Sequence, residues 1–235
     1  MSWRRISRGS HKPFLHHVTK GRPIPVRPVK LRVPQRGPRI LEPEQIVAIL
    51  AACEHLRDRF LLSLLAETGM RAGQVLGLRH ADFVSRSREV HIVPRADNAN
   101  GARAKVRSAV VVPVSTPLVR LYSEYMHTEY GGIDSDYVFV NLFAGPRGQA
   151  WTYAAAYDLV LRLRERTGLD FDPHWCRHAF AARSLRDGVP VEVVSSLPGH
   201  SSITTTLSVY GHLTAEDARN ALEAAGWFTG SEVAL

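Results

Sequence analysis

The first forty residues of the chain contain no aspartate or glutamate, although eleven of them are lysine or arginine and six are proline. The rest of the chain carries 19 of the 30 basic residues and all 22 acidic ones, so the excess positive charge comes from this segment alone. A basic, proline-rich stretch with little apolar periodicity buries too little surface to offset the entropy of ordering it. We expect residues 1–40 to form an extended arm or linker that follows DNA phosphates; a solvated tail that aids solubility is the alternative.

Cysteines, long apolar runs and an export signal are also scarce or absent. Cys53 and Cys176 lie far apart, which gives neither a disulfide framework nor a cysteine-rich metal site. No apolar run approaches the roughly 18 residues of a membrane span, and the basic N-terminus lacks the apolar core of a secretory signal. These absences favour a reducing, cytoplasmic compartment and no membrane partner.

A short stretch from His174 to Tyr210 gathers side chains that suit work on a phosphodiester. His174 and Arg177 are three residues apart, so on one helix they share a face and can both point at one anionic group. A second short helix is expected to end at the Pro-Gly pair that precedes His200, and Tyr210 follows a polar turn. Each of these residues alone is more often a packing or surface residue. Together they indicate phosphate chemistry.

This order of residues resembles the second signature block of the tyrosine recombinase (phage integrase) family, which reads H-x-x-R, then G-H, then a nucleophilic tyrosine about ten residues later. The stretch T-G-M-R resembles the family's first block, in which the arginine is catalytic. In the family a β-hairpin also carries a catalytic lysine eight residues before the proline that ends the last strand, and a lysine stands eight residues before Pro113. The resemblance therefore implies a catalytic set of Arg71, Lys105, His174, Arg177, His200 and Tyr210.

The resemblance also implies a role for each member of this set. Tyr210 attacks the scissile phosphate and holds it as a 3′-phosphotyrosine, while Arg71 and Arg177 clamp the nonbridging oxygens. The remaining implied roles are a further hydrogen bond from His200, protonation of the departing 5′ oxygen by Lys105, and proton acceptance by His174. The family needs no metal, other cofactor or small-molecule substrate, and it assembles as a tetramer on double-stranded DNA.

Further basic residues are expected to contact the DNA backbone. They lie in the arm and in the loop of the predicted hairpin, and they are Arg22, Arg27, Lys30, Arg32, Arg36, Arg39, Arg103 and Arg107. We expect a protein with this interface to act in the cytoplasm, in association with the nucleoid.

The fold that the resemblance implies is mainly α with a small antiparallel β-sheet, in a catalytic domain that we place at residues 41–230. Apolar spacing predicts helices from Glu42, at Asp58–Glu67, Arg71–Arg79, Pro117–Glu129 and Thr152–Thr167, and strands at Glu89–Pro94 and Ala109–Val114. We expect the segment Asp136–Asn141 to be a short strand or an extended core segment, and Trp151 and Tyr153 to be packing residues. The resemblance covers about residues 40–225, so we expect a catalytic domain and its linker, without the large N-terminal helical domain of most members. An amphipathic helix at Thr214–Ala225 is expected to dock either on a neighbouring protomer, as is common in the family, or on its own core.

Three alternatives remain open from the sequence. The chain could be a DNA-binding accessory protein or a catalytically impaired remnant, and Gln74 and Pro198 do stand where the family usually has Glu and Leu. A metal hydrolase could use His174 and His178 as a zinc pair, although the glutamate that such a motif needs is replaced by Trp175. A topoisomerase-like relaxation of supercoils would use the same residues as recombination.

Overall fold

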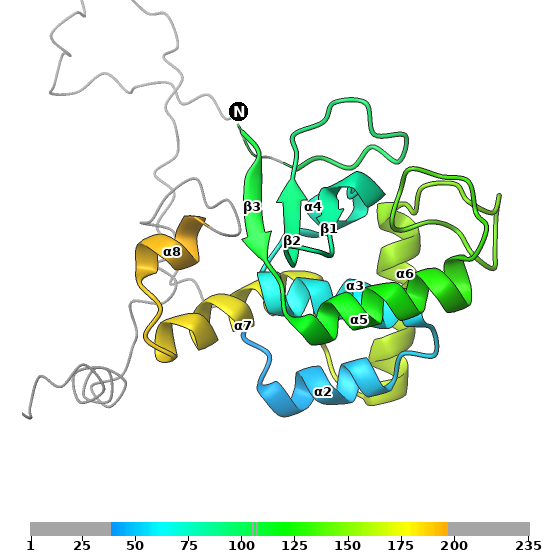
Figure 1. Ribbon diagram of the computed structural model, residues 1–235. Coiled ribbons are helices and arrows are strands. Elements are labelled where there is room, and N and C mark those ends of the chain that lie inside the picture. The colour runs from blue at the N-terminus through cyan, green and yellow to red at the C-terminus, as the bar shows by residue number, and fades with distance from the viewer. Residues whose placement is uncertain (1–38, 105, 107, 197–235) are drawn as a thin grey trace, which may run out of the picture. The chain divides into compact units, whose positions relative to one another are not determined.

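The computed structural model describes residues 39–104, 106 and 108–196 (Figure 1). These residues form a mainly helical domain with one small antiparallel sheet, which confirms the expected fold class. None of the described helices is long and apolar enough to cross a membrane. The elements are α2 (Pro43–Ala51), α3 (Leu56–Thr68), α4 (Ala72–Leu76), η1 (His80–Asp82), β1 (Phe83–Val84), β2 (Glu89–Ile92), β3 (Val110–Pro113), α5 (Thr116–Tyr125), η2 (Met126–Tyr130), α6 (Tyr153–Thr167), α7 (Pro173–Arg186) and α8 (Val191–Ser196).

Helix α3 lies at the centre of the packing. It is buried on nearly every face, and its buried apolar residues include Phe60, Leu61, Leu62, Leu64 and Leu65. Helices α2, α4, α5 and α7 all contact it. In Figure 1 the strands lie above α3, and α2 lies below it. Helices α4 and α7, which position Arg71, His174 and Arg177, therefore both pack on one buried helix.

The sheet has the order β1-β2-β3, and both pairings are antiparallel. Val90 and Ile92 of β2 are buried, whereas Glu89 and His91, which alternate with them, are half-buried, as expected for a strand with one face on the core. Val90 lies opposite the buried Val112 of β3, while Val111 is exposed. The two strands expected from the sequence are confirmed, and the two-residue strand β1 is an addition that alternation could not reveal.

Two helices differ from their expected lengths. The helix expected over Arg71–Arg79 ends at Leu76, because the chain turns at Gly77 and then runs extended. The helix expected over Pro117–Glu129 begins at Thr116, where Ser115 caps it by accepting a hydrogen bond from the Leu118 N–H (3.2 Å). Its last turn widens into the π-helix η2 and ends at Gly131.

The segment Asp136–Asn141 is an extended core segment, which is one of the two expected alternatives. Tyr137 forms an isolated bridge with Arg79, and the Val138 N–H donates to the Leu78 carbonyl (3.0 Å). These bonds join the segment to the chain that leaves α4, and Val138 is fully buried.

Candidate active site

Arg71 lies at the start of α4, directly after the turn that ends α3. Gly69 ends α3 with φ 63°, a left-handed conformation that glycine adopts without steric cost. A Cβ atom at Gly69 would lie 2.5 Å from the ring of Phe180, so α7 packs directly against this turn. The turn therefore fixes the backbone just before Arg71, and partial burial lowers the pKa of the Arg71 guanidinium below its ordinary value.

Gln74 fixes the backbone of Arg71 from the other side. Its side chain is buried, and its Oε1 atom accepts a hydrogen bond of 2.6 Å from the Arg71 N–H. This is the cap that a glutamate at the same position could also provide, so the change to an amide keeps the acceptor. The Nε2 atom of Gln74 is buried and has no hydrogen-bond partner among the described residues.

Arg177 reaches the same turn from α7. Its side chain is 2% exposed, and its Nη1 atom donates a hydrogen bond of 2.8 Å to the Gly69 carbonyl, 108 residues away in the sequence. Arg177 therefore ties α7 to the turn that leads to Arg71. The sequence placed His174 and Arg177 on one helix face, whereas the structure has His174 exposed and Arg177 inside.

His174 lies in the first turn of α7, where Asp172 caps the helix by accepting a hydrogen bond of 2.8 Å from the His174 N–H. Desolvation lowers the pKa of the imidazole, Arg177 and Arg71 lower it further, and Asp172 raises it. His178 stacks edge-on against His174, with ring centroids 4.4 Å apart, and burial followed by the charges of His174 and Arg177 lowers its pKa to about 4. Both rings are therefore neutral at pH 7, and His174 has the form that accepts a proton.

The zinc-pair alternative gains no support from these contacts. Within the described ranges, no group of three or more His, Cys, Asp or Glu side chains could hold a metal ion. The cation of Arg177, which lowers the pKa of both histidines, would also repel a dication.

A cavity of about 330 Å³ is lined by residues at the start of α4 and at the start of α7. Arg71 and His174 line it together with Arg103, which comes from the loop between β2 and β3. Tyr153 and Tyr157 of α6 also line it, and both are about half exposed. The cavity therefore presents fixed cations, a neutral imidazole and exposed aromatic rings on one surface, a combination that suits a phosphodiester and its flanking groups.

Comparison with known proteins shows the family of the chain. Residues 39–217 match the phage integrase family. The chain belongs to that family. The resemblance read from the signature blocks is thereby confirmed.

Other proteins of similar sequence include recombinases and a transposase. Transposase A from transposon Tn554 of Staphylococcus aureus is 39% identical over 210 residues, which cover 89% of this chain and 58% of the transposase. Tyrosine recombinase XerD of Corynebacterium glutamicum is 34% identical over 166 residues, which cover 70% of this chain and 51% of the recombinase. This phage integrase family chain thus spans a little over half the length of these relatives.

Solved structures show the same fold. The crystal structure of XerA recombinase matches with a TM-score of 0.64 at 23% identity and covers 83% of this chain and 65% of that one. The Tn1549 transposon integrase, solved in complex with transposon right end DNA, matches with a TM-score of 0.66 at 19% identity over 83% of this chain and 68% of that one. The expected recombinase catalytic-domain fold is therefore confirmed.

The structure brings together three of the six residues that the family pattern assigns to catalysis, namely Arg71, His174 and Arg177. The other three lie outside the described residues, as do the hairpin-loop residue Arg107 and all the arm residues predicted to contact DNA except Arg39; they are Lys105, His200, Tyr210, Arg22, Arg27, Lys30, Arg32, Arg36 and Arg107. The helix expected at Thr214–Ala225 also lies outside them. Their roles stay predictions.

Arg39 is the described part of the predicted DNA-binding arm. Its Nη1 atom forms an exposed ion pair of 3.0 Å with Asp170, and its guanidinium lies 5.3 Å from the ring centroid of Trp175. An exposed pair of this kind contributes little to stability. DNA contact by Arg39 therefore stays a prediction.

Sequence reasoning missed two residues of the site. Trp151 is a packing residue as expected, but Tyr153 is exposed at the cavity. Asp172 was also missed, although an aspartate directly before a proline is a recognisable start of a helix.

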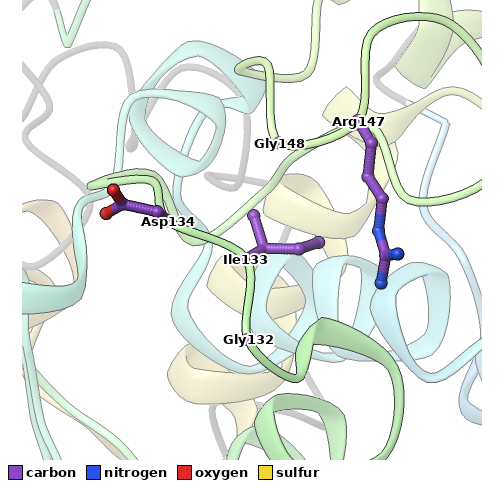
Figure 2. A pocket seen from close by; sticks show the side chains of 5 residues that line it. All are labelled: Gly132, Ile133, Asp134, Arg147 and Gly148. Atoms are coloured by element: carbon purple, nitrogen blue, oxygen red, sulfur yellow. The ribbon is translucent and has the colours of Figure 1, made fainter.

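A second cavity, of about 360 Å³, lies away from this site. Gly132, Ile133, Asp134, Arg147 and Gly148 line it, and Figure 2 shows the charged groups of Asp134 and Arg147 pointing away from each other. It contains none of the predicted catalytic residues.

Proposed function

We propose that this chain cleaves and rejoins DNA strands at specific sites through a 3′-phosphotyrosyl intermediate. The observation that carries the proposal is the cavity in which Arg71, Arg103 and His174 meet beside the buried Arg177. These residues come from three separate parts of the chain, so the fold and not local sequence gathers them. Double-stranded DNA is the proposed substrate, and the cytoplasm, in contact with the nucleoid, is the proposed place of action.

The first chemical step forms a bond between the Tyr210 oxygen and phosphorus. A free phenol has a pKa near ~10, so forming its anion at neutral pH costs roughly 4 kcal/mol. His174 would take the proton, since its lowered pKa keeps the ring neutral and able to accept one. The nearby guanidinium groups stabilise the phenolate and the charge that grows on the phosphate.

The second part of the step breaks the bond between phosphorus and the 5′ oxygen. An alkoxide leaves poorly, so Lys105 would donate a proton to it. Arg71 and Arg177 would hold the nonbridging oxygens with parallel N–H donors, and His200 would add another hydrogen bond. The phosphotyrosine keeps the energy of the broken bond, so attack by a new 5′ hydroxyl rejoins the strand without ATP.

Covalent trapping tests this proposal. The protein is incubated in EDTA with nicked suicide duplexes taken from its own genomic neighbourhood, and denaturing gels report any protein–DNA adduct. We expect an adduct with the wild-type chain and none with Tyr210→Phe, while both bind the DNA. DNA binding without an adduct on any substrate would instead support an accessory protein or a remnant.

Phosphate binding by the arm and the number of chains assembled on DNA are tested by separate measurements. If roughly six arm phosphate contacts form, the logarithm of the binding constant should fall against the logarithm of salt concentration with a slope of about −5. A flat salt response would exclude the arm as a phosphate-binding segment. We propose a tetramer on DNA, which mass measurement of the trapped complex would test.

A further inference from the structure

The residues that precede Lys105 lie closely against α4. We call Asn98–Ala104 the limb; it is the stretch of the loop between β2 and β3 that directly precedes this lysine. Gly73 lies within α4, and Gly77 is the residue that ends this helix. A Cβ at Gly73 would lie 2.7 Å from the Arg103 carbonyl and would also clash with the Tyr153 hydroxyl, and one at Gly77 would lie 3.0 Å from the Asn98 amide nitrogen. The two glycines therefore let the limb approach the helix that carries Arg71.

Asn100 fastens the limb in this place. Its Nδ2 atom donates to the Leu76 carbonyl (2.9 Å) and to the Trp151 carbonyl (2.8 Å), and its Oδ1 atom accepts from the Ala102 N–H (3.0 Å). Two carbonyl partners and one N–H partner leave a single possible orientation of the amide. One side chain thus links the limb to the end of α4 and to the start of α6.

The two carbonyls are groups that secondary structure leaves without a helical partner. Leu76 is the last residue of α4, and the last carbonyls of a helix have no intrahelical donor. Trp151 directly precedes Thr152, the N-cap of α6. Asn100 supplies both carbonyls with donors and so gives the limb a fixed place on the domain.

The entry to the limb is held as well. Arg95 forms a two-pronged ion pair with the buried Asp82, at 2.6 and 2.7 Å. The Ala99 N–H donates to the Tyr137 hydroxyl (2.8 Å). Ala102 and Ala104 are buried, so the limb is anchored up to the residue before Lys105.

We infer that Asn100 is a positioning residue for proton delivery: by tying the limb to α4 and α6, it sets the point of the chain from which Lys105 reaches the departing 5′ oxygen. The inference rests on the proposed function, in which the bond from Tyr210 to phosphorus forms as the bond to the 5′ oxygen breaks and the Lys105 ammonium gives that oxygen its proton. Asn100 touches neither DNA nor the reacting atoms. Its loss should therefore impair the protonation of the leaving group in particular.

Changing the leaving group of the DNA substrate distinguishes a role of Asn100 in proton delivery from a purely structural role. Suicide duplexes are prepared with either oxygen or sulfur at the 5′ bridging position of the scissile phosphate. A thiolate leaves without a proton, so the sulfur substrate does not need the general acid. With Asn100→Ala we expect adduct formation to fall about 100-fold on the oxygen substrate and to stay within about threefold of wild type on the sulfur substrate.

Both rates are measured with the same preparation, so their ratio is independent of the fraction of folded protein. Asn100→Asp keeps the oxygen that accepts from Ala102 but loses both donors, and it should show the same change in the ratio. Glu129→Gln serves as a stability control, since Glu129 bonds to the opposite end of α3, and it should keep the wild-type ratio.

Equal losses on the two substrates, or no loss on either, would overturn the role of Asn100 while the wild-type adducts still support the proposed function. Absence of a wild-type adduct on both substrates would overturn the proposed function and this inference together.

Discussion

Charged groups are paired at the N-terminal end of α3, whereas cations predominate beyond its C-terminal end. At the N-terminal end, Arg57 is buried beside Asp58, with Nη2 2.7 Å from Oδ1, and its guanidinium lies 3.9 Å from the ring centroid of Trp151. Glu129 accepts hydrogen bonds there from the Leu56 and Arg57 N–H groups, at 2.9 and 3.0 Å. Charge at this end is matched by opposite charge or by helix donors.

At the C-terminal end of α3, the turn at Gly69 leads to a surface that is rich in cations. Arg71, Arg103 and His174 line the cavity there, and Asp172 is the single carboxylate among the described residues of its lining. The pKa values of Arg71 and His174 are lowered, which means that the surroundings disfavour additional positive charge. An anionic phosphate would relieve that cost. One end of α3 therefore stabilises the fold, whereas the other is held at an electrostatic cost that a bound anion would reduce.

The largest expected effect on the free energy of unfolding is at the N-terminal end of α3, where the charges are paired. Asp58→Asn leaves the buried Arg57 without its carboxylate, and breaking a buried pair in this way costs about 3–5 kcal/mol. Chemical denaturation should show that loss, while the rate of adduct formation per folded molecule stays at the wild-type value.

A double variant sharpens this test. Replacing both partners, with Arg57→Met and Asp58→Leu, removes the uncompensated charge and should recover part of the lost stability. A double variant less stable than Asp58→Asn would show that the hydrogen bond from Arg57 to the Val140 carbonyl (3.2 Å) matters more than the ion pair.

At the C-terminal end of α3, which we call the cationic end, a substitution should reduce adduct formation strongly and stability little. Arg71→Ala removes one preorganised donor, so adduct formation should fall by about 10² to 10³. Its free energy of unfolding should change by less than about 1 kcal/mol, because the half-buried guanidinium is held at an electrostatic cost. Single-turnover trapping and denaturation measure the two quantities. If Arg71→Ala lowered the free energy of unfolding as much as Asp58→Asn does, the proposed difference between the two ends of α3 would be wrong.

The sequence predicted much of this arrangement but not how it is held. Signature spacing found Arg71, His174 and Arg177, and apolar periodicity found α3 and the two longer strands. The sequence alone could not show that Arg177 is buried against Gly69, because that contact joins residues 108 positions apart. Asn100 was equally hidden, since an asparagine in a polar loop predicts only a turn until tertiary packing supplies its carbonyl partners.

A smaller effect is expected from the remote cap of α3. Glu129→Gln keeps one acceptor but loses the charge that faces two N–H groups, so it should lower the free energy of unfolding by about 1 to 1.5 kcal/mol. Glu124→Gln, an exposed neighbour on α5, is the matched control and should change stability by less than about 0.5 kcal/mol. Equal values for the two variants would contradict the capping role.

The smallest effect is a pH dependence at the cationic end. Burial lowers the pKa of His178 from 6.5 to about 4, so the unfolded chain binds a proton more readily than the folded one. The stability that the neutral ring provides is therefore fully present above pH 6.5 and is lost as the pH falls toward 4. Because the ring is only partly buried, we expect a slope well below the limit of about 1.4 kcal/mol per pH unit for one proton. The free energy of unfolding, measured by chemical denaturation between these pH values, should depend less steeply on pH in His178→Gln than in the wild type. His127→Gln changes an exposed histidine on η2 and should keep the wild-type dependence. If His178→Gln kept the wild-type slope, the acid sensitivity would have to come from other groups, such as the neighbouring His174, and His178 would not contribute to it.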